Sequence, residues 1–124
     1  MSDKPSKIQI RAQVLKILSE YRNVKNSQNE KIARDIEIIN TIEDKKQVAK
    51  ILFKEIASNN LSEYVNVCAI ILLESIDGPT FEECAFEFLR DKNNSDDNKF
   101  YVISLIKQKG IYFDYDEIDN YIQD

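Results

Sequence analysis

Residues 14–18 read Val-Leu-Lys-Ile-Leu, and residues 48–52 read Val-Ala-Lys-Ile-Leu, 34 residues further along the chain. The same shift aligns three isoleucines with three other aliphatic residues: Ile36, Ile39 and Ile42 with Ile70, Leu73 and Ile76. Apolar residues three or four apart make one stripe along an α-helix. A period of 20–50 residues built from helix pairs is typical of stacked helical repeats. The sequence therefore predicts an all-α chain of repeated helix pairs.

Helix-start signals recur at a matching interval. A Ser, Thr, Asp or Asn can cap a helix, and a Glu or Gln three residues later can bond back to it. The sequence offers such pairs at Ser6, Ser27, Asp44, Asn60, Thr80 and Asp114, and Ser95 is a seventh cap without the reciprocal partner. Alternate caps from 27 onwards are 33 to 36 residues apart. We therefore expect about seven helices.

Two helix ends and one buried helix are also predicted. Asp77-Gly78-Pro79 is expected to end the fourth helix and Gly110 the sixth, because Gly tolerates the left-handed conformation that follows many helices. The stretch 60–76 is apolar almost all round. Such a helix is buried on several sides, so we expect it to be the inner helix of the array.

The stretch 48–79 resembles a HEAT or armadillo-type repeat, with a first helix near 48–52 and a second over 67–76, and 83–110 reads as another unit. The resemblance implies one domain, 1–124, of antiparallel helix pairs stacked in a short right-handed α-solenoid. Its units would be 7–43, 44–79 and 80–110, followed by a terminal helix at 114–124. The period also fits tetratricopeptide repeats, but their Trp, Gly and Tyr signature is missing. HEAT-like proteins are mostly binding scaffolds, so the resemblance implies a non-enzymatic protein-binding module.

Composition excludes several classes of site. The chain has no His, two Gly and two Cys. Catalytic triads, His-ligated zinc, glycine-rich phosphate loops and four-thiolate metal sites are therefore impossible. Cys68 and Cys84 lie in apolar helical patterns and are expected to be small buried residues. We predict no catalytic residue, cofactor or metal.

Charge is divided between the two halves of the chain. Residues 1–60 carry 12 Lys or Arg and 8 Asp or Glu, whereas residues 61–124 carry 5 and 14, so the net charge of −5 combines +4 with −9. The acidic half suits a protein partner with a basic surface. Tyr is enriched at interfaces. The candidate contact surface therefore consists of Tyr112, Asp114, Tyr115, Asp116, Asp119 and Tyr121.

Two other functions stay open at this point. A small, acidic bacterial immunity or inhibitor protein that masks a basic toxin or nuclease would explain the −9 half. Lys46, Lys50 and Lys54 form a basic stripe at helical spacing, which suits nucleic acid, although the net acidity of the chain disfavours it. The charged N-terminus and the short apolar runs predict a cytoplasmic protein without a membrane span.

Overall fold

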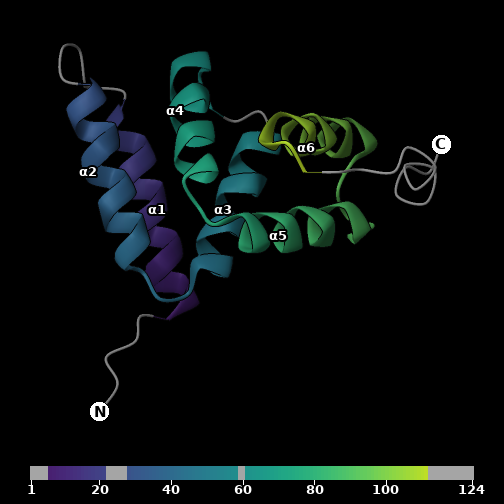
Figure 1. Ribbon diagram of the computed structural model, residues 1–124, viewed down its shortest axis with the longest axis horizontal. Coiled ribbons are helices and arrows are strands. Elements are labelled where there is room, and N and C mark those ends of the chain that lie inside the picture. The colour runs from purple at the N-terminus through teal and green to yellow at the C-terminus, as the bar shows by residue number, and fades with distance from the viewer. Residues whose placement is uncertain (1–5, 22–27, 59–60, 112–124) are drawn as a thin grey trace.

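The computed structural model describes residues 6–21, 28–58 and 61–111. Over these ranges the chain forms helices and no strand, which confirms the all-α prediction (Figure 1). The six helices are α1 (Lys7–Glu20), α2 (Gln28–Thr41), α3 (Lys45–Ala57), α4 (Glu63–Glu74), α5 (Gly78–Arg90) and α6 (Asp96–Lys109). The expected seventh helix, 114–124, lies outside the described residues. No helix in the described ranges is long and apolar enough to cross a bilayer.

Three of the predicted helix starts are confirmed. Ser6 and Gln9 form a complete capping box, in which each side chain accepts the backbone N–H of the other, at 3.2 Å and 2.7 Å. Asp44 caps α3 and Ser95 caps α6, each through the backbone N–H three residues on. Gly110 ends α6 with φ of 84°, as predicted. The predicted caps at 27 and 114 lie outside the described residues.

The predicted cap of α4 is wrong. The helix begins at Glu63, and Ser62 is its N-cap in place of Asn60. The Ser62 hydroxyl accepts the backbone N–H of Val65 at 3.4 Å. Both positions carry a side chain that can cap a helix, so local chemistry alone does not choose between them.

The turn between α4 and α5 also differs from the prediction. Asp77 is the N-cap of α5, and its carboxylate accepts the backbone N–H of Thr80 at 3.0 Å. Gly78 and Pro79 therefore open α5, whereas Gly78 was expected at the left-handed end of α4. Proline suits a first helical turn because its missing N–H would have no partner there. Thr80 lies inside the helix.

The central helix of the array is α3, not α4. It packs against all five other described helices, whereas α4 packs mainly against α1, α2 and α3 (Figure 1). Val67 of α4 is 48% exposed, and Ile70 and Ile71 are only partly buried. The apolar composition of α4 thus overstates its burial. The core side chains of α3 are Val48, Ala49, Ile51, Leu52, Phe53, Ile56 and Ala57.

Helices α3 and α5 pack side by side, and two side-chain contacts join α4 to α6. The Asn66 amide of α4 donates to the Tyr101 hydroxyl of α6, and Lys109 of α6 donates to the Glu74 carbonyl at the end of α4. Both contacts link residues 35 positions apart. Lys46 of α3 faces Glu83 of α5, and Lys50 faces Glu87. The number of residues along the chain between the two partners is the same in both pairs. In a parallel helix pair, residues that advance together along both helices stay opposite each other. The α3–α5 pair is therefore parallel and in register where these side chains meet, whereas long side chains, and not close packing, join α4 to α6.

Candidate functional site

The predicted basic stripe, Lys46, Lys50 and Lys54, is exposed along the edge of α3 that lies next to α5. Lys46 forms an ion pair with Glu83, and Lys50 pairs with Glu87 at 3.2 Å. The bond to Glu83 raises the pKa of Lys46 above its ordinary value. All four side chains are about half exposed, so solvent screens both pairs and each contributes little to stability.

Lys54 is the member of the stripe that has no ion-pair partner within the described part of the chain. Its counterpart at the same offset on α5 is Asp91, which ends that helix. The two side chains line a groove without pairing. Glutamates neutralise the charges of Lys46 and Lys50, and Lys54 alone of the three lysines keeps an unpaired charge within the described part of the chain. The stripe is therefore not a continuous cationic surface.

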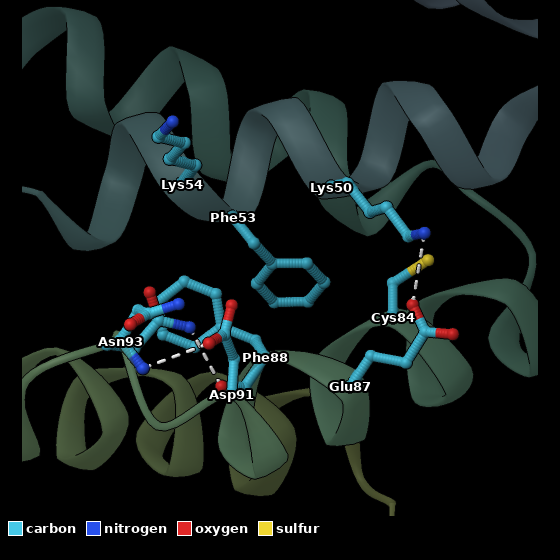
Figure 2. A pocket seen from close by; sticks show the side chains of 9 residues that line it. Lys50, Phe53, Lys54, Cys84, Glu87, Phe88, Asp91 and Asn93 are labelled. Atoms are coloured by element: carbon cyan, nitrogen blue, oxygen red, sulfur yellow. Dashed lines mark hydrogen bonds and ion pairs between the residues drawn. The ribbon is translucent and has the colours of Figure 1, made fainter.

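A groove of about 590 Å³ lies between α3 and α5. Figure 2 shows Lys50 and Lys54 on the α3 side and Glu87 and Asp91 on the α5 side, with the Phe53 ring between the two helices. Its complete lining is Lys50, Phe53, Lys54, Cys84, Glu87, Phe88, Asp91, Asn93 and Asn94. A mixture of apolar surface and a few polar groups is the usual composition of a binding pocket.

Aromatic side chains form the apolar side of this groove. The Phe53 and Phe88 rings lie with centroids 6.5 Å apart, and Phe53 also contacts Phe81 edge to face at 5.2 Å. Phe53 is buried, whereas Phe88 is partly exposed. The ring of Phe88 is therefore the apolar surface that an incoming group would meet first.

The rim of the groove is built by the turn that ends α5. The Asp91 carboxylate accepts the Asn93 backbone N–H at 2.9 Å, and the Asn94 side-chain amide donates to the Phe88 carbonyl at 2.9 Å. The second bond satisfies one of the carbonyls that a helix end leaves without an intrahelical donor. It holds the turn against α5 and leaves the exposed Asn93 side chain at the rim.

The two cysteines are buried and unpaired, which confirms the prediction that they are small core residues. Cys84 lies at the groove, and its Sγ is 3.5 Å from the Lys46 carbonyl. Burial raises the pKa of Cys84 to about 11 and also raises that of Cys68. Both are therefore protonated thiols at neutral pH, a form that is a poor nucleophile.

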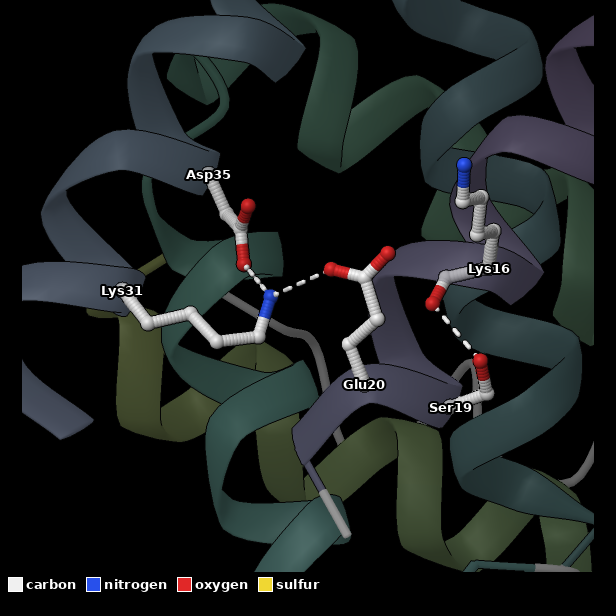
Figure 3. Close-up of polar contacts among 5 residues, drawn as sticks. All are labelled: Lys16, Ser19, Glu20, Lys31 and Asp35. Atoms are coloured by element: carbon white, nitrogen blue, oxygen red, sulfur yellow. Dashed lines mark hydrogen bonds and ion pairs between the residues drawn. The ribbon is translucent and has the colours of Figure 1, made fainter. Parts of the chain in front are cut away.

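A buried charged cluster joins α1 and α2. Lys31 bonds to Asp35 at 2.7 Å and to Glu20 at 3.3 Å (Figure 3). Its ammonium also lies 4.4 Å from the centre of the Tyr21 ring, a cation–π distance. Lys31 and Asp35 are 8% and 4% exposed, so the carboxylates and the ring replace the water that the ammonium loses.

Tyr21 completes this cluster. Its hydroxyl is buried without a hydrogen-bond partner among the described residues. Burial raises the pKa of Tyr21, and the nearby Asp35 carboxylate raises it further. The cluster is closed to solvent on most sides, so its geometry suits a role in packing α1 against α2. The cluster was not predicted from the sequence, although the spacing of Lys31 and Asp35 inside an isoleucine stripe was a usable signal.

The remaining predicted site residues lie outside the part of the chain that the structure describes. The candidate contact surface Tyr112, Asp114, Tyr115, Asp116, Asp119 and Tyr121 lies outside the described residues. In the described ranges no group of three or more Cys, Asp or Glu side chains is placed to hold a metal ion. The groove itself was not predicted, because the pattern within one helix does not show which helix lies beside it.

No family model, curated protein or solved structure matches this chain.

Proposed function

We propose that this chain is a non-enzymatic protein-binding module of the HEAT-like α-solenoid type. Support comes from the parallel, in-register packing of α3 with α5. Stacked repeats place equivalent helices side by side in this way. Units 44–79 and 80–110 would then be successive repeats, and residues 7–43 a first one.

The groove between α3 and α5 carries the proposal. It offers a partly exposed aromatic ring, Phe88, between the unpaired Lys54 and the carboxylate of Asp91. We propose that a partner segment inserts an apolar side chain against Phe88 and places an acidic group near Lys54. Apolar contact supplies most of the binding energy in such sites, and the few polar groups orient the ligand.

A second contact region belongs to the same proposal. The acidic half of the chain, and within it the Tyr- and Asp-rich residues after 111, suits a basic surface on the same partner. Opposite charges at the rim of an interface mainly raise the association rate. The acidic residues would therefore steer the partner, and the groove would hold it.

Site-specific photocrosslinking tests the groove. A photoreactive amino acid at Asn93 lies at the rim, whereas the same group at Asn40, an exposed Asn on α2, is a matched control. We expect a defined protein to be crosslinked from position 93 and not from position 40. With that protein purified, Phe88→Ala and Lys54→Glu should weaken binding at least tenfold. Equal crosslinking from both positions, or unchanged affinity, would argue against the groove.

The immunity or inhibitor alternative rests on the net charge of −9 in residues 61–124. It requires that the chain block an activity and not merely bind. A basic toxin or nuclease encoded by a neighbouring gene is the discriminating observation. Mixed at equal molar amounts, the purified chain should abolish the activity of that toxin. Binding without inhibition would favour the scaffold function.

Nucleic-acid binding by the basic stripe is the weaker alternative, because two of its three lysines already face glutamates. Binding that depends on phosphate contacts strengthens steeply as salt is lowered. Gel-shift assays with DNA and RNA at low ionic strength should therefore detect no complex. A complex that disappears in Lys54→Glu would revive this alternative.

A further inference from the structure

Large apolar side chains are exposed at four positions within the described ranges. Ile8 of α1 is 81% exposed, Val67 of α4 is 48%, and Phe100 and Tyr101 of α6 are 51% and 37%. Contiguous exposed apolar patches that polar residues surround are typical of contact surfaces. Ile8 lies on α1, whereas Val67, Phe100 and Tyr101 lie on α4 and α6.

The three apolar residues of α4 and α6 are accompanied by acidic ones. Glu63 lies one turn before Val67, and Asp97 lies one turn before Phe100 and Tyr101, with both carboxylates exposed. The Asn66 amide donates to the Tyr101 hydroxyl at 3.0 Å, which ties the two helices together at this level. We call the set Glu63, Val67, Asp97, Phe100 and Tyr101 the acidic face. Helix α4 contains no Lys or Arg at all.

The fourth exposed residue has the opposite surroundings. Ile8 lies one turn before Arg11, and Arg11 lies one turn after Lys7, with all three side chains exposed. None of the three has a charged partner among the described residues. Helix α1 contains no Asp or Glu before Glu20. We call Lys7, Ile8 and Arg11 the basic face.

From this pairing we infer that a second copy of the chain covers the acidic face. The basic face of one copy docks on the acidic face of the next, so that Ile8 meets Phe100, Tyr101 and Val67 while Lys7 and Arg11 meet Glu63 and Asp97. Each face matches the other in both apolar and charged character, and neither matches itself. Like charges disfavour contact of either face with itself, so the contact joins two different faces, basic to acidic.

Such an association is weak and sensitive to salt. Both faces are small, and contacts below about 1,200 Å² form transient complexes. The charged groups are exposed, so salt screens their attraction over a Debye length of about 8 Å at physiological ionic strength. The full chain should therefore be monomeric when dilute and show a rising average mass over about 10 μM to 1 mM. The rise should diminish in high salt.

Analytical ultracentrifugation of two complementary variants tests the inference. Ile8→Ser with Arg11→Ser removes the basic face, and Asp97→Ser with Phe100→Ser removes the acidic face. Each variant alone should stay monomeric at every concentration. Their 1:1 mixture should form a heterodimer that does not grow further, because one intact face remains on each. Glu82→Ser with Lys16→Ser, two exposed residues outside both faces, should associate like the unchanged chain.

Several outcomes overturn the inference. The unchanged chain could stay monomeric at 1 mM. The variant without the basic face could still associate alone. The 1:1 mixture of the two variants could remain monomeric. Circular dichroism melting checks that each variant is folded. Where a double variant has a lower Tm, Arg11→Ser and Phe100→Ser singly replace it in the same mixing experiment.

Discussion

Lys109, near the end of α6, donates to the main-chain carbonyl of Glu74 at the end of α4. Its ammonium also reaches the Ile76 carbonyl at 3.4 Å and lies 5.3 Å from the centre of the Phe81 ring. A cation at a helix C-terminus is favourable because the last carbonyls lack donors and carry partial negative charge. One side chain thus joins the ends of α4 and α6 to the start of α5.

The Lys109 contact leads to the first prediction. Lys109→Met keeps most of the apolar stem but leaves these carbonyls without their donor, so the free energy of unfolding should fall by about 1–2 kcal/mol. Urea denaturation followed by circular dichroism measures this change. Lys92→Met, which alters an exposed lysine in the loop after α5, is the control and should be nearly neutral. Equal stability of the two variants would show that the Lys109 contact contributes nothing.

The buried cluster of α2 leads to the second prediction. Asp35→Ala leaves the Lys31 ammonium buried with only Glu20 opposite, so it should cost about 3 kcal/mol. Replacing both partners, as Lys31→Met with Asp35→Leu, should cost less than Asp35→Ala because no unpaired charge remains. Thermal and urea unfolding of the three chains give the comparison. Glu37→Ala, at an exposed position on the same helix, should change stability by under about 0.5 kcal/mol.

Cap formation at Asp77 makes stability depend on pH. The backbone N–H of Thr80 lowers the pKa of the Asp77 carboxyl below its ordinary value, so the charged form favours folding. This stabilisation is complete above the unfolded pKa of about 3.9 and is lost as pH falls through the lower folded value. Asp77→Ala should therefore cost about 1 kcal/mol near pH 7, with a smaller difference below pH 3.

Asp77→Asn separates capping from titration. An Asn side chain accepts the same N–H but carries no titratable proton. The stability gap between this variant and the unchanged chain should therefore shift in the variant's favour as pH falls below 4. A pH-independent gap would mean that the Asp77 charge is not stabilised by the helix start.

Thiol reactivity provides the fourth prediction. Burial raises the pKa of Cys84 to about 11, and Cys68 is fully buried, so neither is a reactive thiolate at neutral pH. A disulfide reagent should label the folded chain slowly at pH 7.5 and label both cysteines at once in denaturing urea. Stabilising variants should slow the labelling further if it proceeds through opening of the fold. Rapid labelling of Cys84 in the folded chain would show that the groove admits solvent to its sulfur.

The helix starts show what local sequence can and cannot predict. Ser6, Asp44 and Ser95 were correct because a cap depends on hydrogen bonds within four residues. Asn60 and Thr80 were wrong because a second capping residue, Ser62 or Asp77, lies two or three positions away. The choice between neighbouring caps depends on where the preceding helix ends, which packing decides.

The candidate site depended much more on tertiary structure. Phe53 and Phe88 are both unremarkable members of helical stripes, and the groove arises only because α3 and α5 lie in register. The same register places Glu83 and Glu87 opposite Lys46 and Lys50, and so neutralises a stripe that looks uniformly basic in the sequence. Residue spacing within one helix contains no information on the charges of its neighbour.

By itself, the sequence determined that this chain is all-α, that its apolar stripes recur about every 34 residues, and where several helices begin and end. These properties follow from periodicity and short-range hydrogen bonds. Only the tertiary structure decided that α3 is central, that Lys31 is buried among carboxylates and that Lys54 is left unpaired beside a groove. Burial and pairing depend on which surfaces meet, and those surfaces come from residues that are far apart along the chain.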